Sequence, residues 1–308
     1  MIPGNKSSGL LWGISNETLA NRGSGDKKIQ SYNYRICLTN NKTNRIDITK
    51  PDNYEPKHFE LFLRLINKTK PEKIRQFLKQ DLMPHSKTDF NNQGAFSTDM
   101  IGMNYEYPEG SYDTRRKIIK QHEDYNKGFL YFIGHDSRVP IHLREEMQSW
   151  GYPKDEYIDS GHWSHQLYVR ESRRMIGKYL MTEHNALGTV TVDDGIAMSS
   201  YRMDSHNHQR VVVNGHVKNE GDVQWPSQPP KPFPVSYRAL VPKSDECHNV
   251  IVPVCLSSTH IAYGSIRMEY TFMELGEASA VAAAMAIDHK TSVQQINVKD
   301  LKLKLNYH

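Results

Sequence analysis

Chemistry-capable side chains gather in one short run of this chain, SSTHIAYGSIRMEYTFMELGE, which spans residues 257–277. His260 can take or give a proton near neutral pH, because imidazole titrates at about pH 6.5. Arg267 can hold an anionic group, because a guanidinium stays charged and donates several hydrogen bonds. A run of alanine and other small residues, 278–287, follows directly. This order predicts a reactive loop ahead of a helix that packs closely against a neighbour.

The residues that lead into this run are NVIVPVCLS, 249–257, and their apolar character predicts a buried strand. A strand, a polar turn and a helix would bring the helix N-terminus to a ligand, where unpaired N–H groups and the macrodipole favour negative charge. Small residues such as Gly276 would let the helix lie against a flat ring. Composition alone leaves a second interpretation open, a buried alanine-rich core helix that follows a polar loop.

The stretch MDSHNHQR, 203–210, places Asp204, His206 and His208 at alternate positions. On a strand, these three side chains would project from one face. Such a set could bind a metal, line a flavin or substrate pocket, or form a hydrogen-bonded structural turn. No closing ligand set stands at metal-binding spacing elsewhere in the sequence, so we expect no metal. Asp204 and His206 are catalytic candidates of second rank.

Two further polar stretches suit a polyol or sugar-like ligand, because amides and carboxylates beside aromatic rings can bind hydroxyl groups. The alternative for both stretches is a loop that caps helices. The residues concerned are Asp89, Asn91, Asn92 and Asp99 in KTDFNNQGAFSTD (87–99), and His162, His165 and Arg170 in GHWSHQLYVRESRR (161–174).

Hydrophobic periodicity predicts helices in the first part of the chain and short strands from about residue 189 onward. Residues 1–24 are rich in Gly, Ser and Asn and are expected to be irregular. The predicted helices are 57–68, 71–80, 114–136, 141–150 and 166–185, and the predicted strands are 32–39 and pieces of 195–204, 210–217 and 237–242, with a proline-rich loop at 225–234.

Composition narrows the class of protein. The chain has 39 basic and 35 acidic residues, a net charge of +4, and no Lys/Arg block, so nucleic acid is not the expected partner. Cys37, Cys247 and Cys255 show no CxxC spacing and predict free or buried thiols, with a bridge between the last two left open. The apolar run is too short to span a membrane, and the first residues lack the features of a signal peptide. The sequence leaves the localisation unknown, since the chain as given would stay in the cytoplasm whereas full-length relatives could be exported.

Several familiar nucleotide and nucleophile motifs do not occur. The sequence has no GxGxxG, and GSGDKK, 23–28, lacks the third glycine and the preceding strand that give this fingerprint its meaning. It also has no GxSxG elbow, no GK[ST] phosphate loop and no HExxH. A complete dinucleotide site is therefore not encoded in these residues.

Segments along most of the chain resemble a family of FAD-dependent oxidoreductases whose bacterial members are often labelled xanthan lyases. The resemblance runs in family order from about residue 25 to about residue 305. The matching segments are GDKKIQSYNYRICLT, MPHSKTDFNNQGAFSTDMIG, YPEGSYDTRRKIIKQHEDYNKGFLYF, DSRVP, WGYPKDEYIDSGHWSHQLYVRESRRMIGKYLMTEHN, YRMDSHNHQRVV, NEGDVQ and VPVCLSSTHIAYGSIRMEYTFMELGEASAVAAAMA.

The resemblance implies an α/β (α+β) fold. Residues 1–245 would form a substrate domain with a helical insertion, and 246–308 would supply a C-terminal strand and helix to an FAD-binding Rossmann-type domain. In the family, an N-terminal Rossmann segment with the glycine fingerprint precedes the region that matches. The chain is thus expected to be a fragment, a split-gene product or a truncated product without that segment. Tyr270 replaces a proline, and Glu277 a glutamine, that the family tends to have.

By the same resemblance, residues 257–277 meet the isoalloxazine ring of FAD, and the positive end of the following helix stabilises the reduced flavin anion. His260 is the expected general base or acid, and Arg267 holds substrate or flavin charge. The expected cofactor-binding residues are Ser258, Thr259, Gly264, Ser265, Met268, Glu269 and Gly276.

The resemblance implies hydride transfer between FAD and a carbon that bears a hydroxyl group or an amine. The sequence does not identify the substrate, for which a carbohydrate-like compound is one option. A separate polypeptide that supplies the N-terminal FAD-binding half is a candidate partner, and no membrane partner is expected. Two other interpretations stay open, a carbohydrate-binding or polysaccharide lyase-type module and a catalytically inactive truncated protein.

Overall fold

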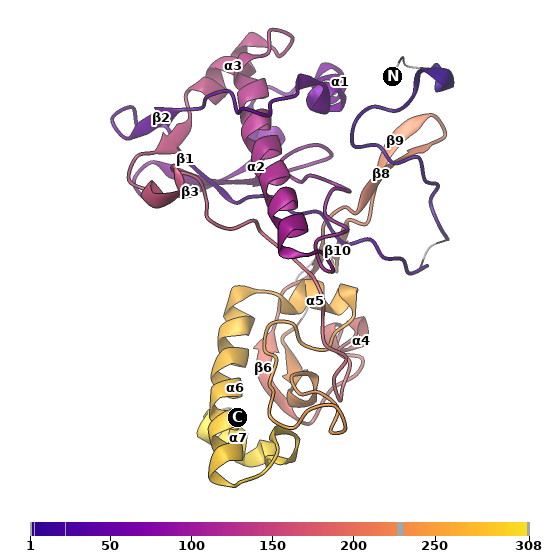
Figure 1. Ribbon diagram of the computed structural model, residues 1–308, viewed down its shortest axis with the longest axis vertical. Coiled ribbons are helices and arrows are strands. Elements are labelled where there is room, and N and C mark those ends of the chain that lie inside the picture. Colours follow the sequence, from indigo (N-terminus) through magenta and orange to yellow (C-terminus); the bar gives the residue numbers. More distant parts are fainter. Residues whose placement is uncertain (1, 3, 22, 227–230, 307–308) are drawn as a thin grey trace. The chain divides into compact units, whose positions relative to one another are not determined.

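The chain divides into two compact units (Figure 1). Unit 1 is Met1–Arg170 with Asn207–Gly221, and unit 2 is Glu171–His206 with Asp222–His308. The predicted division at residue 245 concerns which part serves the substrate and which part serves the flavin. This division stays a prediction, because the two units are defined by their compactness and not by what they bind.

A computed structural model describes residues 2, 4–21, 23–226 and 231–306. The middle of the predicted proline-rich loop at 225–234 therefore lies outside the described residues. The described part of the N-terminal stretch is irregular apart from one short 3-10 turn, as its composition predicts.

Unit 1 is built around an antiparallel sheet of five short strands in the order β2-β5-β1-β4-β3. Ile36 and Leu38 of β1 are both buried, which is the period-two pattern of a strand with one face in the core. Ile36 lies opposite Phe90 of β4, so their buried side chains pack together across the pair. The strands are β1 (Ile36–Thr39), β2 (Arg45–Asp47), β3 (Leu78–Met83), β4 (Lys87–Asn92) and β5 (Gly151–Pro153).

Three helices pack into the core of unit 1, and α2 is the longest of them (Figure 1). Phe62 of α1 meets Phe129 of α2 edge to face, with ring centroids 4.8 Å apart. Ser111 caps α2, because its Oγ accepts a hydrogen bond from the N–H of Thr114 at 3.2 Å. The helices are α1 (Glu60–Thr69), α2 (Tyr112–His135) and α3 (Ile141–Gln148), close to three of the predicted ranges.

A hairpin of β8 (Gln209–Val213) and β9 (His216–Glu220) completes unit 1. Its two-residue turn is Asn214-Gly215, and both residues have positive φ, 50° and 78°. Such a turn matches the twist of the flanking strands, which explains why the sequence VVVNGHV folds back on itself. The strand pieces predicted within 210–217 are thus confirmed as a hairpin.

Unit 2 combines four helices with two small antiparallel sheets. Leu275, Ala278 and Ala282 of α6 are fully buried at a spacing of three and four, so one side of this helix faces the core. That side packs on β6. The elements are β6 (Gly195–Ser199) paired with β11 (Phe233–Ser236), β7 (Met203–Ser205) paired with β10 (Val223–Trp225), α4 (Glu183–Ala186), α5 (His260–Ile266), α6 (Glu269–Asp288) and α7 (Val298–Lys304).

The described residues thus form an α+β fold with seven α-helices and several small antiparallel sheets. None of the helices in this part of the chain has the length and apolar character needed to cross a membrane. Cys37, Cys247 and Cys255 are all free. The helix predicted over the small residues 278–287 is confirmed, although α6 begins earlier, at Glu269.

Two predicted helices are wrong. Residues 71–80 form the 3-10 turn η3 (Ile74–Gln76) and enter β3, because pairing with β4 outweighs the helical spacing of the apolar residues. Residues 166–185 run mostly without regular structure, and only Glu183–Ala186 turn into a helix. In both segments tertiary contacts override the local pattern.

Two predicted strands are also wrong, and one of them is the C-terminal strand expected at 249–257. Pro253 interrupts this segment, and Val250 and Val254 are exposed. A strand of this composition is stable when neighbours pair with both of its edges, and the described residues provide only an isolated bridge at Ser258. The second, expected within 237–242, is a 3-10 turn at Tyr237–Ala239.

Asp194 is a buried carboxylate that ties the start of β6 to β11. The Ser236 hydroxyl donates to its Oδ2 at 2.7 Å, and Arg238 donates from Nε at 2.9 Å. Burial alone would raise the pKa of Asp194, but the hydrogen bonds from Arg238 and Ser236 outweigh it and hold the pKa below its ordinary value. This contact therefore stabilises unit 2 above about pH 4, and its contribution is lost as the pH falls through the depressed pKa.

We predict that Asp194→Asn lowers the free energy of unfolding by about 1–3 kcal/mol at pH 7, because a charged acceptor of several hydrogen bonds is lost. The difference from wild type should shrink below about pH 4. Urea unfolding followed by circular dichroism at pH 7 and at about pH 3 measures both values. Asp193→Asn is the control, since Asp193 is 94% exposed. Equal stability of Asp194→Asn and wild type at pH 7 would contradict this account.

Candidate functional site

His260 is the first residue of α5 and has a partner on each ring nitrogen. Thr259 caps the helix, because its side chain accepts a hydrogen bond from the N–H of Ala262 at 3.2 Å. The imidazole Nδ1 lies 2.6 Å from Oε2 of Glu171, and Nε2 lies 3.0 Å from Oγ of Ser205. A carboxylate, an imidazole and a hydroxyl thus stand in a row, all within unit 2.

This row fixes where the proton sits on the neutral imidazole. A carboxylate can only accept a hydrogen bond, so Nδ1 carries the proton and donates it to Glu171. The lone pair is then on Nε2, which accepts a hydrogen bond from the Ser205 hydroxyl. An imidazole with a carboxylate on Nδ1, and with a lone pair on Nε2 that accepts from a hydroxyl, has the arrangement of a general base that acts through this hydroxyl.

Glu171 itself is a buried charge that needs more than one partner. Its side chain is 2% exposed, and Nη1 of Arg174 lies 3.2 Å from the same oxygen that meets His260. Arg174 also donates from Nε to the carbonyl oxygen of Ser258 at 3.0 Å. The arginine therefore links the carboxylate to the backbone just before α5, and this link holds the imidazole in place.

A glycine lets α5 approach β7 closely. A Cβ atom at Gly264 would lie 2.8 Å from the carbonyl oxygen of Asp204, so no larger residue fits without a shift of the backbone. Ser205 follows Asp204 on β7, and this close approach brings its hydroxyl to His260. The role of Gly264 that the structure displays is packing, whereas its predicted contact with a cofactor stays a prediction.

Arg267, predicted to hold substrate or flavin charge, is buried in an ion pair. Its Nη2 lies 2.8 Å from Oδ2 of Asp204 and donates to the Asp204 carbonyl oxygen at 3.1 Å. The side-chain amide of Gln224 donates to the other carboxylate oxygen of Asp204. Since Arg267 and Asp204 neutralise each other, the structure presents them as an anchor between α5 and β7.

The side chains of Asp204, His206 and His208 would share one face only on a continuous strand, and no continuous strand runs across 203–210. β7 pairs with β10 over only three residues and ends at Ser205, so His206 and His208 lie outside strands. His206 Nε2 is 3.9 Å from Oδ2 of Asp204, which is at the outer edge of an ion-pair contact. Asp204, His206 and His208 therefore do not share one face of a strand, because the pairing that would continue the strand stops after three residues.

Two buried hydroxyls just before α5 find no partner among the described residues. Within the part of the chain that the structure describes, Ser257 Oγ and Ser258 Oγ make no hydrogen bond. The backbone beside them is held, because Met181 donates to the Ser257 carbonyl at 3.1 Å and Thr259 donates to Met181 at 2.9 Å. An unmet buried hydroxyl costs roughly 1–3 kcal/mol. These positions therefore fit a bound group that brings its own hydrogen-bonding atoms, as flavin does.

The remaining predicted cofactor residues fall into two groups. Ser265 is buried and donates its hydroxyl to the carbonyl of Tyr201, so its side chain serves internal packing. Met268 is the N-cap residue of α6, Glu269 is exposed in the first turn, and Gly276 borders open space. Only the second group is open to a ligand.

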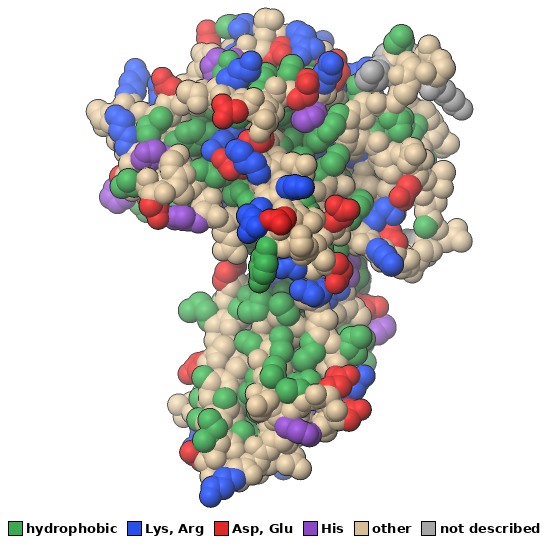
Figure 2. Space-filling model, viewed as in Figure 1, with side chains coloured by type: hydrophobic (Ala, Val, Ile, Leu, Met, Phe, Trp, Pro, Cys, Tyr) green, Lys and Arg blue, Asp and Glu red, His purple; other side chains and the backbone are tan. Residues whose placement is uncertain are grey.

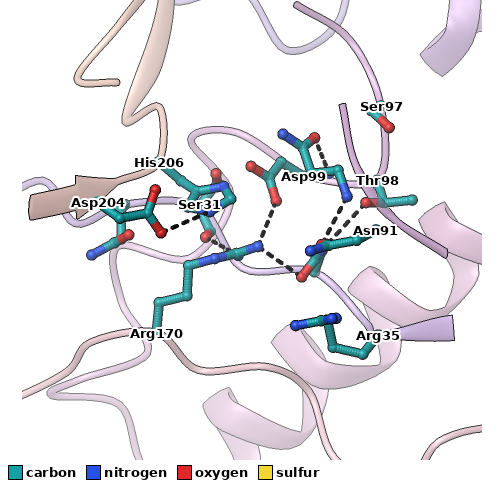
Figure 3. Close-up of polar contacts among 12 residues, drawn as sticks. Ser31, Arg35, Asn91, Ser97, Thr98, Asp99, Arg170, Asp204 and His206 are labelled. Atoms are coloured by element: carbon teal, nitrogen blue, oxygen red, sulfur yellow. Dashed lines mark hydrogen bonds and ion pairs between the residues drawn. The ribbon is translucent and has the colours of Figure 1, made fainter. Parts of the chain in front are cut away.

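The residues predicted to bind a polyol are committed to contacts within unit 1 (Figure 3). Arg170 donates to the Ser31 carbonyl at 2.6 Å and to Oδ1 of Asn33 at 2.9 Å, and it lies 3.2 Å from Asp99. Asn91 accepts from Asn33 at 2.9 Å. The other candidates have comparable partners, which are Arg35 for Asp89, the N–H of Asp99 for Asn92, the carbonyl of Glu156 for His162, and Asp159 for His165.

Sequence analysis missed Glu171, Arg174 and Ser205. The first two belong to RESRR, whose mixed charge is typical of an exposed helix and gives no hint of burial. Ser205 stands between Asp204 and His206, whose side chains look better suited to chemistry. The one available signal was a lone acidic residue in a basic segment, which is unusual but not specific.

Comparison with known proteins places these residues in a family. The family model described as FAD dependent oxidoreductase matches residues 7–305, which cover nearly all of both units and every member of the row around His260. No curated protein and no solved structure matches the chain. Since the family match extends over nearly the whole chain, the protein belongs to the family of FAD-dependent oxidoreductases.

Proposed function

We propose that the protein transfers a hydride between FAD and a carbon that bears a hydroxyl group or an amine, with His260 as the general base or acid. The observation that carries the proposal is the row of Glu171, His260 and Ser205, because it gives a neutral imidazole one fixed tautomer. When bound, the flavin supplies the hydride acceptor. The side chains of this chain supply the proton transfer and the charge that accompanies it.

His260 receives the proton of an alcohol substrate as the hydride leaves. The Ser205 hydroxyl gives its proton to Nε2 and takes the substrate proton in exchange, so the serine ends neutral. The imidazolium that forms lies 2.6 Å from the Glu171 carboxylate, which stabilises its charge. In the reverse direction the same path returns the proton to the product.

The flavin ring is proposed to lie beside the loop that precedes α5 and the first turns of α6. Ser258 offers a buried hydroxyl without a partner among the described residues, and Gly276 leaves space on α6. The N-terminal N–H groups of α6 favour negative charge on the ring. Thr259, Met268 and Glu269 border this surface, while Gly264, Ser265 and Arg267 support it from inside.

An exposed apolar stripe on α6 points to a further polypeptide segment at the cofactor. Tyr270, Met273 and Ile287 are 44%, 75% and 76% exposed, and exposed Ala280 and Ala284 lie between them at helical spacing. Hydrophobic side chains gather over the part of unit 2 that α6 occupies (Figure 2). We propose that the segment that packs on this stripe carries the glycine fingerprint, because residues 1–308 contain no GxGxxG. This segment is either joined to this chain or a separate polypeptide.

Residues 1–308 alone are expected to bind FAD weakly or not at all, because the contacts to pyrophosphate and AMP come from the fingerprint. A titration followed by flavin fluorescence measures this affinity. Addition of the Rossmann segment of a family member should tighten binding, and Ala280→Arg on the stripe should prevent the gain. Leu303→Arg is the matched control, since Leu303 is an exposed apolar residue of α7. Tight stoichiometric binding of FAD by residues 1–308 alone would refute the proposal that a further segment with the glycine fingerprint is needed at the cofactor.

In a protein completed with that segment, His260→Ala should slow flavin reduction by roughly 100-fold to 10,000-fold, the usual cost of a lost acid or base. Glu171→Gln should slow it less, by about 10-fold to 100-fold, because the imidazole remains but loses its counter-charge. FAD retention should barely change in either variant. Stopped-flow bleaching of the flavin band, with retained FAD counted separately, measures both effects.

His165→Ala is the control for these variants, because His165 is an exposed histidine that pairs with Asp159 in unit 1. A purely structural His260 would give the opposite pattern, with flavin or stability lost and a near-normal rate in the protein that still holds FAD. An unchanged rate in His260→Ala would remove this residue from catalysis and leave His206 and Arg267 as the candidates.

A further inference from the structure

Unit 1 contains a cavity of about 530 Å³ between α2, the 3-10 turn η2 (Pro56–Phe59) and the segment around Met100. This volume lies within the range of roughly 300–1,000 Å³ that is usual for small-molecule sites. Phe59, Met100 and Tyr125 are buried residues of its lining. The sequence motifs did not single out this region, and none of its residues belongs to the row around His260.

Three rings stack along the wall of this cavity. The indole of Trp12 lies 4.2 Å from the imidazole of His58 and 5.6 Å from the ring of Tyr125, centroid to centroid, at interplanar angles of 24° and 27°. Tyr125 is fixed in turn, because its hydroxyl donates to the carbonyl of Ser97 at 2.7 Å. The indole is therefore oriented before any ligand arrives, which lowers the entropic cost of binding. Flat ring faces of this kind suit the C–H face of a sugar ring.

Polar groups line the same cavity, mostly from one side of α2. The Asp124 carboxylate is held by the Asn53 amide at 2.8 Å and by Lys120 at 2.8 Å. Gln121 stands about one turn and Lys117 about two turns before Asp124 on this side of α2. Within the described ranges neither of them makes a hydrogen bond or an ion pair, so both can bond a ligand.

The charges around the cavity balance. Lys117 and Lys120 are matched by Glu55 and Asp124, so the lining has no net charge. Burial lowers the pKa of His58 below its ordinary value, so its ring is neutral at pH 7 and offers one donor and one acceptor. An ionic ligand would meet as many like charges as opposite ones. Hydroxyl groups both donate and accept hydrogen bonds, and they therefore match each polar group of this lining.

We propose that this cavity binds a neutral saccharide of one or two pyranose rings, with one ring face against the aromatic wall and hydroxyl groups on His58 and the polar residues of α2. All of these residues lie in unit 1, and the binding requires no flavin. The site therefore stands independently of the function proposed for His260. A planar aromatic compound would contact only the aromatic wall and would leave the polar groups without hydrogen bonds. The charge of an anionic sugar would be attracted only by the two lysines of the lining.

Isothermal titration calorimetry of residues 1–308 without FAD tests this site. The ligands are glucose, mannose and cellobiose as neutral sugars, glucuronate as the anionic sugar, and indole as the planar compound. We expect a neutral sugar to bind most tightly, and we expect Trp12→Ala and Asp124→Asn to weaken its binding at least about 10-fold. Trp225→Ala is the matched control, because Trp225 is an exposed tryptophan of unit 2, and it should bind as wild type does.

Trp12→Phe separates a binding defect from a folding defect, because it keeps a flat ring and should retain part of the affinity. Circular dichroism confirms that each variant is folded before its titration. The proposal is overturned if none of the three neutral sugars binds at concentrations up to about 50 mM, or if folded Trp12→Ala binds them as wild type does. Tighter binding of glucuronate or of indole than of every neutral sugar would also overturn it.

Discussion

The buried carboxylate of Glu171 is the constraint on which the site around His260 depends. A charge that is removed from water must be met by partners of opposite charge or by hydrogen-bond donors. Arg174 and His260 both meet the same oxygen of Glu171, so neither can move freely. This shared oxygen selects the tautomer of His260 and turns its lone pair toward Ser205. The chemistry proposed for the histidine is thus a consequence of how a buried acid is satisfied.

Arg170 and Glu171 are consecutive residues that serve different buried centres. Arg170 bonds Ser31, Asn33 and Asp99 in unit 1, whereas Glu171 bonds residues of unit 2. Each of these two side chains is thus held by long-range contacts within its own unit, and the segment around them has no regular structure where the sequence predicts a helix over 166–185.

The two units reach close packing by different means. Unit 1 fills its core with large aromatic rings, such as Phe62 and Phe129, which leave a cavity where Trp12 and Tyr125 line an open space. Unit 2 relies on glycine and alanine, so that α5 lies against the backbone of β7 and α6 lies on β6. Large rings leave room for a ligand between them. Small residues bring backbone segments close together and the side chains of His260 and Ser205 within hydrogen-bond distance.

The sequence by itself determined the elements whose pattern is local. Helical periodicity in 114–136, the small residues of 278–287 and the Asn-Gly turn of the β8–β9 hairpin each specify a structure through neighbours along the chain. His260 was also identified from the sequence as the residue best suited to proton transfer. Together with the family motifs, these features point to an FAD-dependent oxidoreductase.

Only the tertiary structure decided what surrounds His260. Its partners Glu171 and Ser205 are 89 and 55 residues away in the chain, and no local pattern encodes contacts of such separation. The absence of a strand at 249–257 has a similar cause, because strand formation depends on pairing with distant segments and not on apolar character alone. The residue types thus indicated the kind of chemistry, whereas long-range packing and the burial of charge determined the geometry of the site.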